Sequence, residues 1–218
     1  MKKMLGGFAV GVAAAVAAMV VLGPKAGWTA DEPKTQPWAA QMDVNRPEDL
    51  PVCYARGTDS IARATTPAVG PANLDSTAGL ADPNFKLGYE FYKQCFTQDF
   101  SFSASSRGVV SRTVPDPKTR TPQTDAALQW ANYVNNAFRG PGYNYTQHLM
   151  GSISAHVTGD TAIDQNYLVA THFFGPESGR KGANVVYGTY TDEDVKVNGK
   201  WRIRHRTLDS MASVAIGQ

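Results

Sequence analysis

Apolar residues recur at three- to four-residue spacing in three segments of the first two thirds of the chain, which predicts three helices. The first, residues 45–63, opens with a capping asparagine, an early proline and acidic residues in its first turn. The second, residues 85–96, carries apolar side chains four positions apart. The third, residues 126–139, follows a Thr-Asp cap and has the apolar stripe Leu128, Ala131, Val134 and Phe138.

The pattern changes after the third helix to β-branched and aromatic residues, which predicts antiparallel strands. Residues 145–156 and 166–174 flank a turn signal, so we expect them to pair as a hairpin. Residues 183–195 and the segment from Trp201 flank Asn198-Gly199, which is a strong signal for a second hairpin.

Between these segments, residues 64–86 and 104–123 contain Pro and no clear periodicity, so we interpret both as connections. A first strand is expected to begin near Phe96. A connection as long as residues 64–86 is unusual inside a compact domain unless it has a function, and its place after the first helix makes it a candidate lid.

Alternation along the first hairpin places its histidines on defined faces. One face of the first strand carries His148, Met150, Ser152, Ser154 and His156. The second strand places Leu168, Ala170, His172 and Phe174 on one face, so a histidine lies near the outer end of each strand and suggests a pocket mouth. In the final strand the same rule turns Trp201, Ile203 and His205 inward and leaves Arg202, Arg204 and Arg206 as a solvated row.

Three helices followed by a run of antiparallel strands indicate an α+β fold, in which one helix-covered face of a curved sheet could enclose a small-molecule cavity. On the first helix, Asp59 is an acid on the otherwise apolar stripe Val52, Ala55 and Ala62. It could act in such a cavity, or it could be a surface residue paired with Arg56 or Arg63.

The N-terminus has the pattern of an export signal: Lys2 and Lys3 precede an uncharged, mostly apolar run from Met4 to Pro24. We therefore interpret residues 1–30 as an export signal or an uncleaved N-terminal anchor, residues 31–45 as a linker, and residues 46–218 as a single domain. The predicted location is periplasmic or otherwise extracytoplasmic. In that setting Cys53 and Cys95 could form a disulfide, although two buried thiols are equally ordinary.

The formal net charge of +2 includes three basic residues of the leader, which leaves 18 basic against 19 acidic residues in the remainder. That balance argues against a nucleic-acid partner, which would need a basic surface. The chain contains no closely spaced His/Glu metal motif, no phosphate-binding loop and no activated-serine motif. We therefore predict that neither a metal nor a cofactor takes part.

Several of these segments together resemble the nuclear-transport-factor-2-like superfamily. They are Cys53-Tyr-Ala-Arg-Gly-Thr-Asp59, Phe96-Thr-Gln-Asp99, Thr146-Gln-His148-Leu-Met-Gly151 and the stretch from Tyr190 to Trp201-Arg-Ile203. Within it they look like the SnoaL-like branch that includes scytalone dehydratase and lindane dehydrochlorinase. The resemblance covers roughly residues 46–208 and implies a cone-shaped, curled mixed sheet wrapped by helices, with a ligand inside the cone and a homo-oligomer as one option.

Carried over residue by residue, the resemblance implies catalytic roles for Asp59, His148 and His172. Asp59 matches the helix-one aspartate of both enzymes, and His148 matches the histidine placed against it. His172 matches, with a one-residue gap, a second active-site histidine of the dehydratase. The dehydratase's paired tyrosines fall near Thr58 and Phe102, and its substrate-holding Ser and Asn near Gly188 and Tyr190. The acid–base pair is thus retained while the substrate-polarising groups are not.

An imidazole held by a carboxylate can remove a proton from a substrate near neutral pH, and a second histidine could donate to a leaving group or hold a substrate oxygen. This favours a cofactor-independent lyase (dehydratase, elimination or formaldehyde-releasing type) acting on a hydrophobic aromatic or polyketide-like molecule. An isomerase or polyketide cyclase would use the same proton chemistry. The alternative from another class is a non-catalytic small-molecule-binding or accessory domain, in which His148 is simply a hydrogen-bonded core residue. Six residues are candidates to line the cavity, although core packing explains them as well: Tyr54, Trp130, Tyr145, Met150, Tyr167 and Tyr190.

Overall fold

The three helices lie where the apolar spacing predicts them. The structure, a computed structural model, describes residues 42–106, 109–114, 121 and 123–217, all within one compact unit that spans Pro37–Gln218. Its helices are the short η2 (Pro47–Asp49), then α2 (Leu50–Ala62), α3 (Pro83–Cys95) and α4 (Ala126–Arg139). The predictions for the leader concern residues outside this description. No helix in the described ranges has the length and apolar character needed to cross a bilayer.

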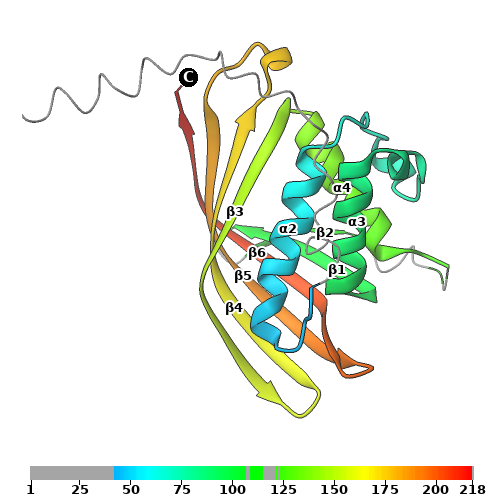
Figure 1. Ribbon diagram of the computed structural model, residues 1–218. Coiled ribbons are helices and arrows are strands. Elements are labelled where there is room, and N and C mark those ends of the chain that lie inside the picture. The colour runs from blue at the N-terminus through cyan, green and yellow to red at the C-terminus, as the bar shows by residue number, and fades with distance from the viewer. Residues whose placement is uncertain (1–41, 107–108, 115–120, 122, 218) are drawn as a thin grey trace, which may run out of the picture. The chain divides into compact units, whose positions relative to one another are not determined.

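In the described part of the chain, six strands form one sheet, which is mixed because one of its strand pairs is parallel (Figure 1). They are β1 (Phe96–Ser106), β2 (Val109–Val114), β3 (Tyr143–Thr158), β4 (Thr161–Phe174), β5 (Ala183–Val197) and β6 (Lys200–Ile216). Their order is β2-β1-β6-β5-β4-β3, and β1 runs parallel to β6 while every other neighbour is antiparallel. The helices cover one face of this curled sheet (Figure 1), so the predicted α+β cone is confirmed. The prediction that residues 104–123 form only a connection is wrong, because β2 lies within them.

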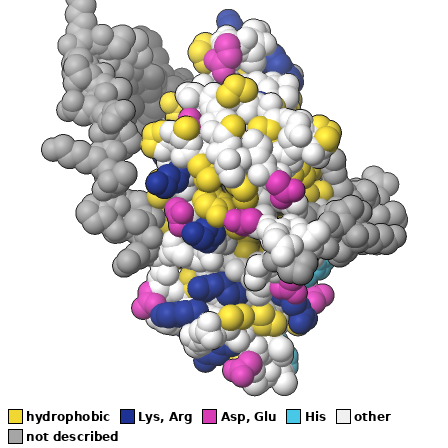
Figure 2. Space-filling model, turned by 90° about the vertical axis from the view of Figure 1, so that its right-hand side faces the viewer, with side chains coloured by type: hydrophobic (Ala, Val, Ile, Leu, Met, Phe, Trp, Pro, Cys, Tyr) yellow, Lys and Arg dark blue, Asp and Glu magenta, His cyan; other side chains and the backbone are white. Residues whose placement is uncertain are grey.

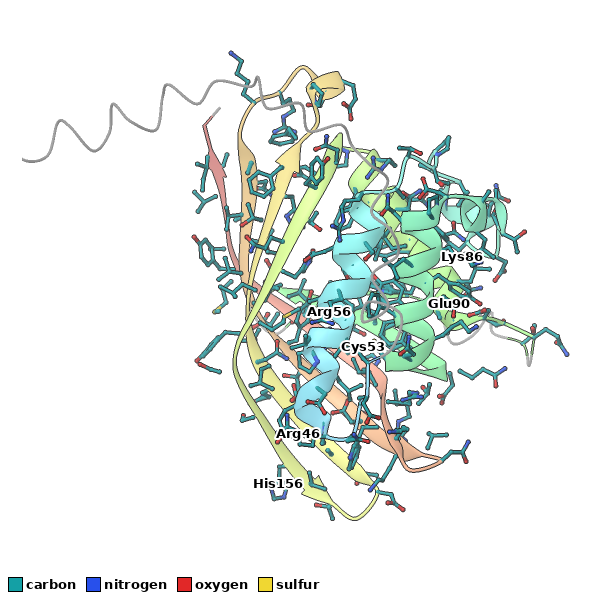
Figure 3. All side chains as sticks on the ribbon, in the orientation of Figure 1. Arg46, Cys53, Arg56, Lys86, Glu90 and His156 are labelled. Carbon is teal, nitrogen blue, oxygen red and sulfur yellow. A yellow bond between two sulfur atoms is a disulfide. The ribbon has the colours of Figure 1, made fainter. Side chains whose placement is uncertain are left out.

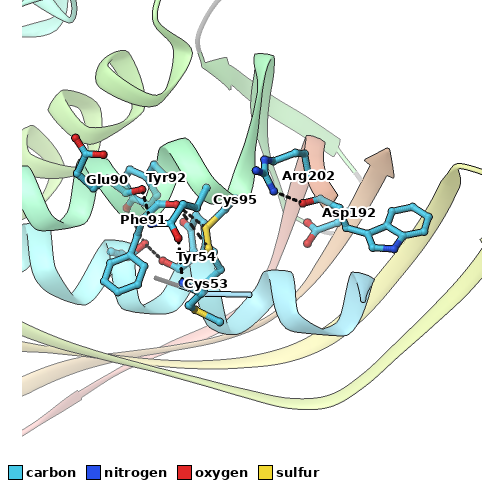
Figure 4. Close-up of a disulfide and its surroundings, with 12 residues drawn as sticks. Cys53, Tyr54, Glu90, Phe91, Tyr92, Cys95, Asp192 and Arg202 are labelled. Carbon is cyan, nitrogen blue, oxygen red and sulfur yellow. Dashed lines mark hydrogen bonds between the residues drawn. A yellow bond between two sulfur atoms is a disulfide. The ribbon is translucent and has the colours of Figure 1, made fainter. Parts of the chain in front are cut away.

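The core fills the space between the helices and the sheet, and it is rich in aromatic side chains. Helices α2 and α3 approach closely because two glycines face each other. A Cβ at Gly57 would lie 2.6 Å from the Tyr92 ring, and one at Gly88 would lie 2.6 Å from the Gly57 carbonyl oxygen. A disulfide joins Cys53 on α2 to Cys95 at the end of α3 (Figure 4). Of the two interpretations of these cysteines, the disulfide is therefore confirmed and the pair of buried thiols is wrong.

A β-bulge in β3 changes which side chains face the helices. The pairing of β3 with β4 shifts between Gly151 and Ser154, and Ser152 has a positive φ of 49°. Beyond the shift the alternation inverts, so Ser152, Ser154 and His156 are exposed and do not share the His148 face, contrary to the prediction. Figure 3 shows His156 near the distal end of the β3–β4 hairpin.

A second bulge, in β6, removes Arg206 from the predicted solvated row of arginines, while Arg204 is exposed as predicted. The register moves from Ile203 opposite Asp194 to His205 opposite Glu193, which inserts one extra residue. Arg206 therefore points into the protein and is fully buried, although strict alternation predicts it to be solvated. His205, predicted to point inward, is only half-buried and lies 2.6 Å from the Ser101 hydroxyl through its Nδ1 atom.

The long connection between α2 and α3 is held against α4 by amide side chains. Asn132 Nδ2 donates to the carbonyl oxygens of Leu74 (2.7 Å) and Ser76 (2.9 Å). Asn136 Oδ1 accepts from the Val69 amide at 2.9 Å. The connection also contains two short 3₁₀ helices, η3 (Pro71–Asn73) and η4 (Ala78–Ala81). The connection is thus held against α4, and its interpretation as a candidate lid stays a prediction.

Candidate active site

The candidate site is built where the last turn of α2 meets the first half of β3. Asp59 Oδ1 lies 2.7 Å from His148 Nδ1. The His148 side chain is 5% exposed and that of Asp59 is 22% exposed, so both members of the pair are largely buried. Asp59 does not form the predicted alternative surface pair with Arg63, whose Nε atom donates instead to the Asp59 backbone carbonyl. The predicted meeting of helix acid and strand imidazole is therefore present in the structure.

The carboxylate of Asp59 is oriented by two further donors from the same strand. Thr146 Oγ1 donates to Oδ1 at 2.8 Å, and the backbone N–H of His148 donates to Oδ2 at 3.2 Å. Thr146 and His148 share a strand face because they are two residues apart. With its Nδ1–H directed to the carboxylate, the neutral imidazole presents Nε2 as its basic nitrogen.

His172 lies beside this pair, on β4 opposite Thr146. Its ring is nearly perpendicular to that of His148, with centroids 5.7 Å apart. Burial, and secondly the neighbouring His148, lower the pKa of His172 to about 4. Its Nδ1 lies 3.3 Å from the Asn184 carbonyl oxygen, which can accept a hydrogen bond only from a protonated Nδ1. His172 is thus a neutral imidazole at pH 7 with Nε2 as an acceptor, which does not support the predicted donation to a leaving group.

Four of the six predicted lining residues lie between the helices and the sheet, on the face of the sheet that carries His148. The Tyr54 ring meets the His148 ring edge-on at 6.4 Å, and Tyr54 in turn contacts Tyr190 (5.4 Å) and Trp130 (6.4 Å). Met150, two residues beyond His148, packs partly buried against the same core.

Two of the predicted lining residues are misplaced. Tyr145 and Tyr167 are 56% and 57% exposed. Each lies at an odd position of its strand, opposite in face to His148 and His172, so strand alternation turns both away from the site.

Two aromatic residues near the site were not predicted. The rings of Tyr143 and Phe138 lie 5.2 Å and 5.6 Å from that of His172. Phe138 belongs to the predicted stripe of the third helix, so its burial was expected but its contact with a histidine was not.

Sequence comparison identifies a SnoaL-like domain over residues 88–207, more than half of the chain. The chain belongs to the SnoaL-like domain family. No curated protein matches this SnoaL-like chain by sequence.

Comparison with solved structures finds several that are similar to this SnoaL-like domain at low sequence identity. The Kfla4162 protein of Kribbella flavida has a TM-score of 0.51 at 16% identity, covering 76% of this chain and 88% of its own. A provisionally assigned aromatic ring hydroxylase of Novosphingobium aromaticivorans has a TM-score of 0.50 at 19% identity, covering 80% and 93%. A provisionally assigned scytalone dehydratase of the same organism has a TM-score of 0.47 at 17% identity, covering 78% and 85%.

A buried ionic cluster that sequence reasoning missed lies deeper in the SnoaL-like domain. Arg206 binds Asp192 through two hydrogen bonds, Nε to Oδ1 at 2.6 Å and Nη2 to Oδ2. Its guanidinium also lies over the rings of Tyr54 (4.0 Å) and Tyr190 (4.4 Å). Burial alone would lower the pKa of Arg206, but the Asp192 carboxylate raises it overall. Arg206 thereby packs against two of the aromatic residues that were predicted to line the site.

Two more carboxylates, Asp164 and Asp194, belong to this cluster. Burial, followed by the charge of Asp192, raises the pKa of Asp164 to about 7 and that of Asp194 to about 9. Asn166 donates to Asp164 at 3.1 Å, while neither oxygen of Asp194 has a partner among the described residues. Asp192 and Asp194 are two residues apart on β5, and Asp164 of β4 lies directly opposite Asp192; this alternation is the signal that could have revealed the cluster.

The described residues contain no group of three or more His, Cys, Asp or Glu side chains arranged to hold a metal ion. The prediction that neither a metal nor a cofactor takes part stays a prediction.

Proposed function

We propose that this protein is a cofactor-independent lyase in which Asp59 and His148 act as an acid–base pair on a small hydrophobic molecule. The observation that carries the proposal is the 2.7 Å contact between Asp59 Oδ1 and His148 Nδ1, with the carboxylate held by Thr146 and by the His148 backbone N–H. A histidine whose one nitrogen is fixed by an oriented carboxylate is the arrangement that general-base catalysis requires.

In the proposed elimination, His148 Nε2 removes a proton from a substrate carbon next to an activating group such as a ketone. The electrons of the broken C–H bond form a C=C bond, and the leaving hydroxide departs with the electrons of its C–O bond. The imidazolium then returns the proton to the hydroxide, which leaves as water. Asp59 stabilises the imidazolium while it exists.

The neighbouring groups suit such a substrate. His172, neutral at pH 7, can accept a hydrogen bond from a substrate hydroxyl through Nε2. The rings of Tyr54, Trp130 and Tyr190 would favour an aromatic or polyketide-like substrate over a charged one. An isomerase or cyclase would begin with the same proton removal and differ only in the fate of the carbanion.

One observation favours the second candidate, a non-catalytic binding domain. The His148 side chain is only 5% exposed and already has a hydrogen-bond partner, as a structural core histidine would. The two functions differ in what happens to a bound ligand.

The test uses a panel of aromatic β-hydroxy ketones, with the absorbance of the conjugated product as readout and calorimetry as a separate measure of binding. Asp59→Asn and His148→Gln should each lower kcat by about a hundred- to ten-thousand-fold, the range of positioned acid–base groups. The affinity for ligand should remain. His156→Gln is the matched control, because His156 lies on the same strand but is exposed.

Turnover by Asp59→Asn and His148→Gln equal to that of the His156→Gln control would contradict the proposal. Ligand binding without turnover by the unsubstituted protein would favour the binding domain.

A further inference from the structure

Tyr143 lies beside His172 because the pairing of β3 with β4 is irregular at the start of β3. The register moves from Tyr143 opposite Phe174 to Tyr145 opposite Phe173, which inserts one extra residue into β3. Strict alternation would turn Tyr143 to the same side of the sheet as the exposed Tyr145, and the extra residue returns it to the helix-covered side. The Tyr143 ring is half-buried against the core, with its centroid 5.2 Å from that of His172.

The chain around Tyr143 is held in place by the connection between β4 and β5. The N–H of Gly175 donates to the carbonyl oxygen of Gly142 at 2.8 Å. Gly142 has a φ of +81°, and a Cβ there would lie 2.6 Å from the Cβ of Ser178, so this close approach requires glycine. The Tyr143 ring also packs against that of Phe174, with centroids 4.9 Å apart. Backbone and ring contacts together give Tyr143 a defined position.

The proposed elimination needs a hydrogen-bond donor for the carbonyl oxygen of the substrate. While His148 removes the proton, the electrons of the C–H bond are shared with the carbonyl, and negative charge develops on its oxygen. The hydroxyl of Thr146 already donates to Asp59. His172 directs its Nδ1–H to the carbonyl oxygen of Asn184, which leaves Nε2 as an acceptor. The donor must therefore come from another residue.

Two tyrosines contact the histidines of the site, and their hydroxyls differ in what they bind. The Tyr54 ring contacts His148, but its hydroxyl interacts with the side chains of Tyr190 and Thr58. The hydroxyl of Tyr143 has no hydrogen-bond partner in the described part of the chain. A phenol can donate a hydrogen bond to an oxyanion and keep its proton. Tyr143 therefore has the donor that the other groups lack.

Building on the proposed function, we propose that Tyr143 binds the carbonyl oxygen of the substrate and stabilises the enolate formed on it. The O–H of Tyr143 donates a hydrogen bond to the oxyanion and keeps its proton throughout. The electrons of the oxyanion then re-form the C=O bond while the C=C bond forms and hydroxide departs with the electrons of its C–O bond. The hydroxide takes the proton held by His148 and leaves as water.

A neutral donor suits an uncharged substrate. The positions that the resemblance assigns to the dehydratase's paired tyrosines, near Thr58 and Phe102, carry no phenol in this chain. Tyr143 replaces them from a different element, the start of β3. The helical side of the molecule carries acidic and basic side chains scattered among apolar ones (Figure 2), so that surface does not favour a ligand of one charge sign. The inferred substrate is an uncharged molecule with a ketone for Tyr143 and a hydroxyl for His172.

The test compares Tyr143→Phe with Tyr145→Phe in the β-hydroxy ketone assay. Tyr143→Phe removes only the hydroxyl and keeps the ring. Its kcat should fall about a hundred- to a thousandfold with little change in KM, the effect of removing one oxyanion donor. Tyr145 is 56% exposed on the opposite face of the same strand, so Tyr145→Phe is the matched control and should keep the kcat of the unsubstituted protein.

A second measurement does not depend on turnover. The phenolate of 4-nitrophenol resembles the enolate and absorbs visible light, whereas the neutral phenol does not, so titration near neutral pH reports binding of the anion. The unsubstituted protein and Tyr145→Phe should bind the phenolate equally. Tyr143→Phe should bind it about ten- to a hundredfold more weakly, because one hydrogen bond to a charged oxygen is lost.

Equal turnover by Tyr143→Phe and Tyr145→Phe, with His148→Gln still inactive, would overturn this inference and leave the proposed function intact. Full turnover by Tyr143→Phe combined with loss of turnover by Arg180→Gln would assign the carbonyl oxygen to Arg180, whose guanidinium lies 3.9 Å from the centre of the Phe174 ring. If the unsubstituted protein shows no turnover, the proposed function fails and phenolate binding decides. Selective loss in Tyr143→Phe would then support the donor, and equal or absent binding in all three proteins would overturn it.

Discussion

At the scale of single residues, the candidate site depends on where one carboxylate is held. Asp59 is positioned by α2, yet both of its orienting donors come from β3, so helix and strand fix the same group. Asp59 and His148 could be predicted because each departs from its local pattern, an acid on an apolar stripe and a histidine on a strand face. The burial of Arg206 could not be predicted, because a single extra residue in β6 reverses the direction of its side chain. No residue type in this part of the sequence indicates that bulge.

Replacing Thr146 with valine should test the orientation of the carboxylate. Valine keeps the β-branched shape but removes the hydrogen bond to Asp59 Oδ1, and hydrogen bonds to charged groups contribute about 1.5–3 kcal/mol. Under the proposed function kcat should fall about ten- to a hundredfold with little change in KM. Thr146→Ser should restore it.

Thr171→Val, at a matched position on the outer side of the neighbouring strand, should behave as the unsubstituted protein. Full activity of Thr146→Val, or a Thr146→Ser variant as impaired as the valine, would exclude this role.

At the scale of elements, the predicted helices agree with the structure, whereas the predicted side-chain directions on the strands are partly wrong. The two outcomes have different physical reasons. Helix α4 has the predicted bounds because its cap and its apolar stripe are both local signals. The strands also lie where alternation predicts, but the bulges in β3 and β6 depend on how strands pair around a curved sheet. Short β2 was missed because it is stabilised by pairing with β1 and has no periodicity long enough to detect.

The packing of α2 on α3 leads to a prediction about the disulfide. Cys53 and Cys95 close a segment with a sequence separation of 42, so the cross-link restricts the unfolded chain. The double variant Cys53→Ala, Cys95→Ala should lower the free energy of unfolding, measured by urea denaturation, by about 2–4 kcal/mol. Any activity of the folded variant should survive, because the Gly57–Gly88 contact still positions α2.

The reduced unsubstituted protein is the control and should match the double variant in stability. An unchanged unfolding midpoint on reduction would contradict the prediction.

At the scale of the whole molecule, the interior face of the sheet is divided into two zones with opposite titration behaviour. The zone near the histidines holds His172, whose pKa is lowered to about 4. The deeper zone holds Asp164 and Asp194, whose pKa values are raised to about 7 and about 9. The groups that act on Asp194 are Asp192, Asp164, Arg206 and, from η2, Glu48. The division follows from strand register and could not be derived from the order of residues alone.

These shifts predict how stability depends on pH. The folded state holds the proton of Asp194 more tightly than the unfolded state, so this stabilisation is present at low pH and is lost as pH rises toward 9. Asp164 acts in the same direction up to about pH 7. His172 acts in the opposite direction, because its neutral form is favoured on folding and stability is lost as pH falls from 6.5 to about 4. Between pH 7 and 9 the carboxylate of Asp194 therefore makes the largest of these three contributions to the pH dependence of stability.

The free energy of unfolding should accordingly fall by on the order of 2 kcal/mol between pH 7 and pH 9, measured by urea denaturation at several pH values. Asp194→Asn keeps the shape of the side chain and cannot ionise, so its stability should be nearly constant over this range and exceed that of the unsubstituted protein at pH 9. Asp160→Asn, in the exposed turn between β3 and β4, should follow the unsubstituted protein. If the Asp194→Asn curve ran parallel to that of the control, the buried carboxylate would not hold its proton in the folded state, and the cluster would have to be ionised and neutralised by other means.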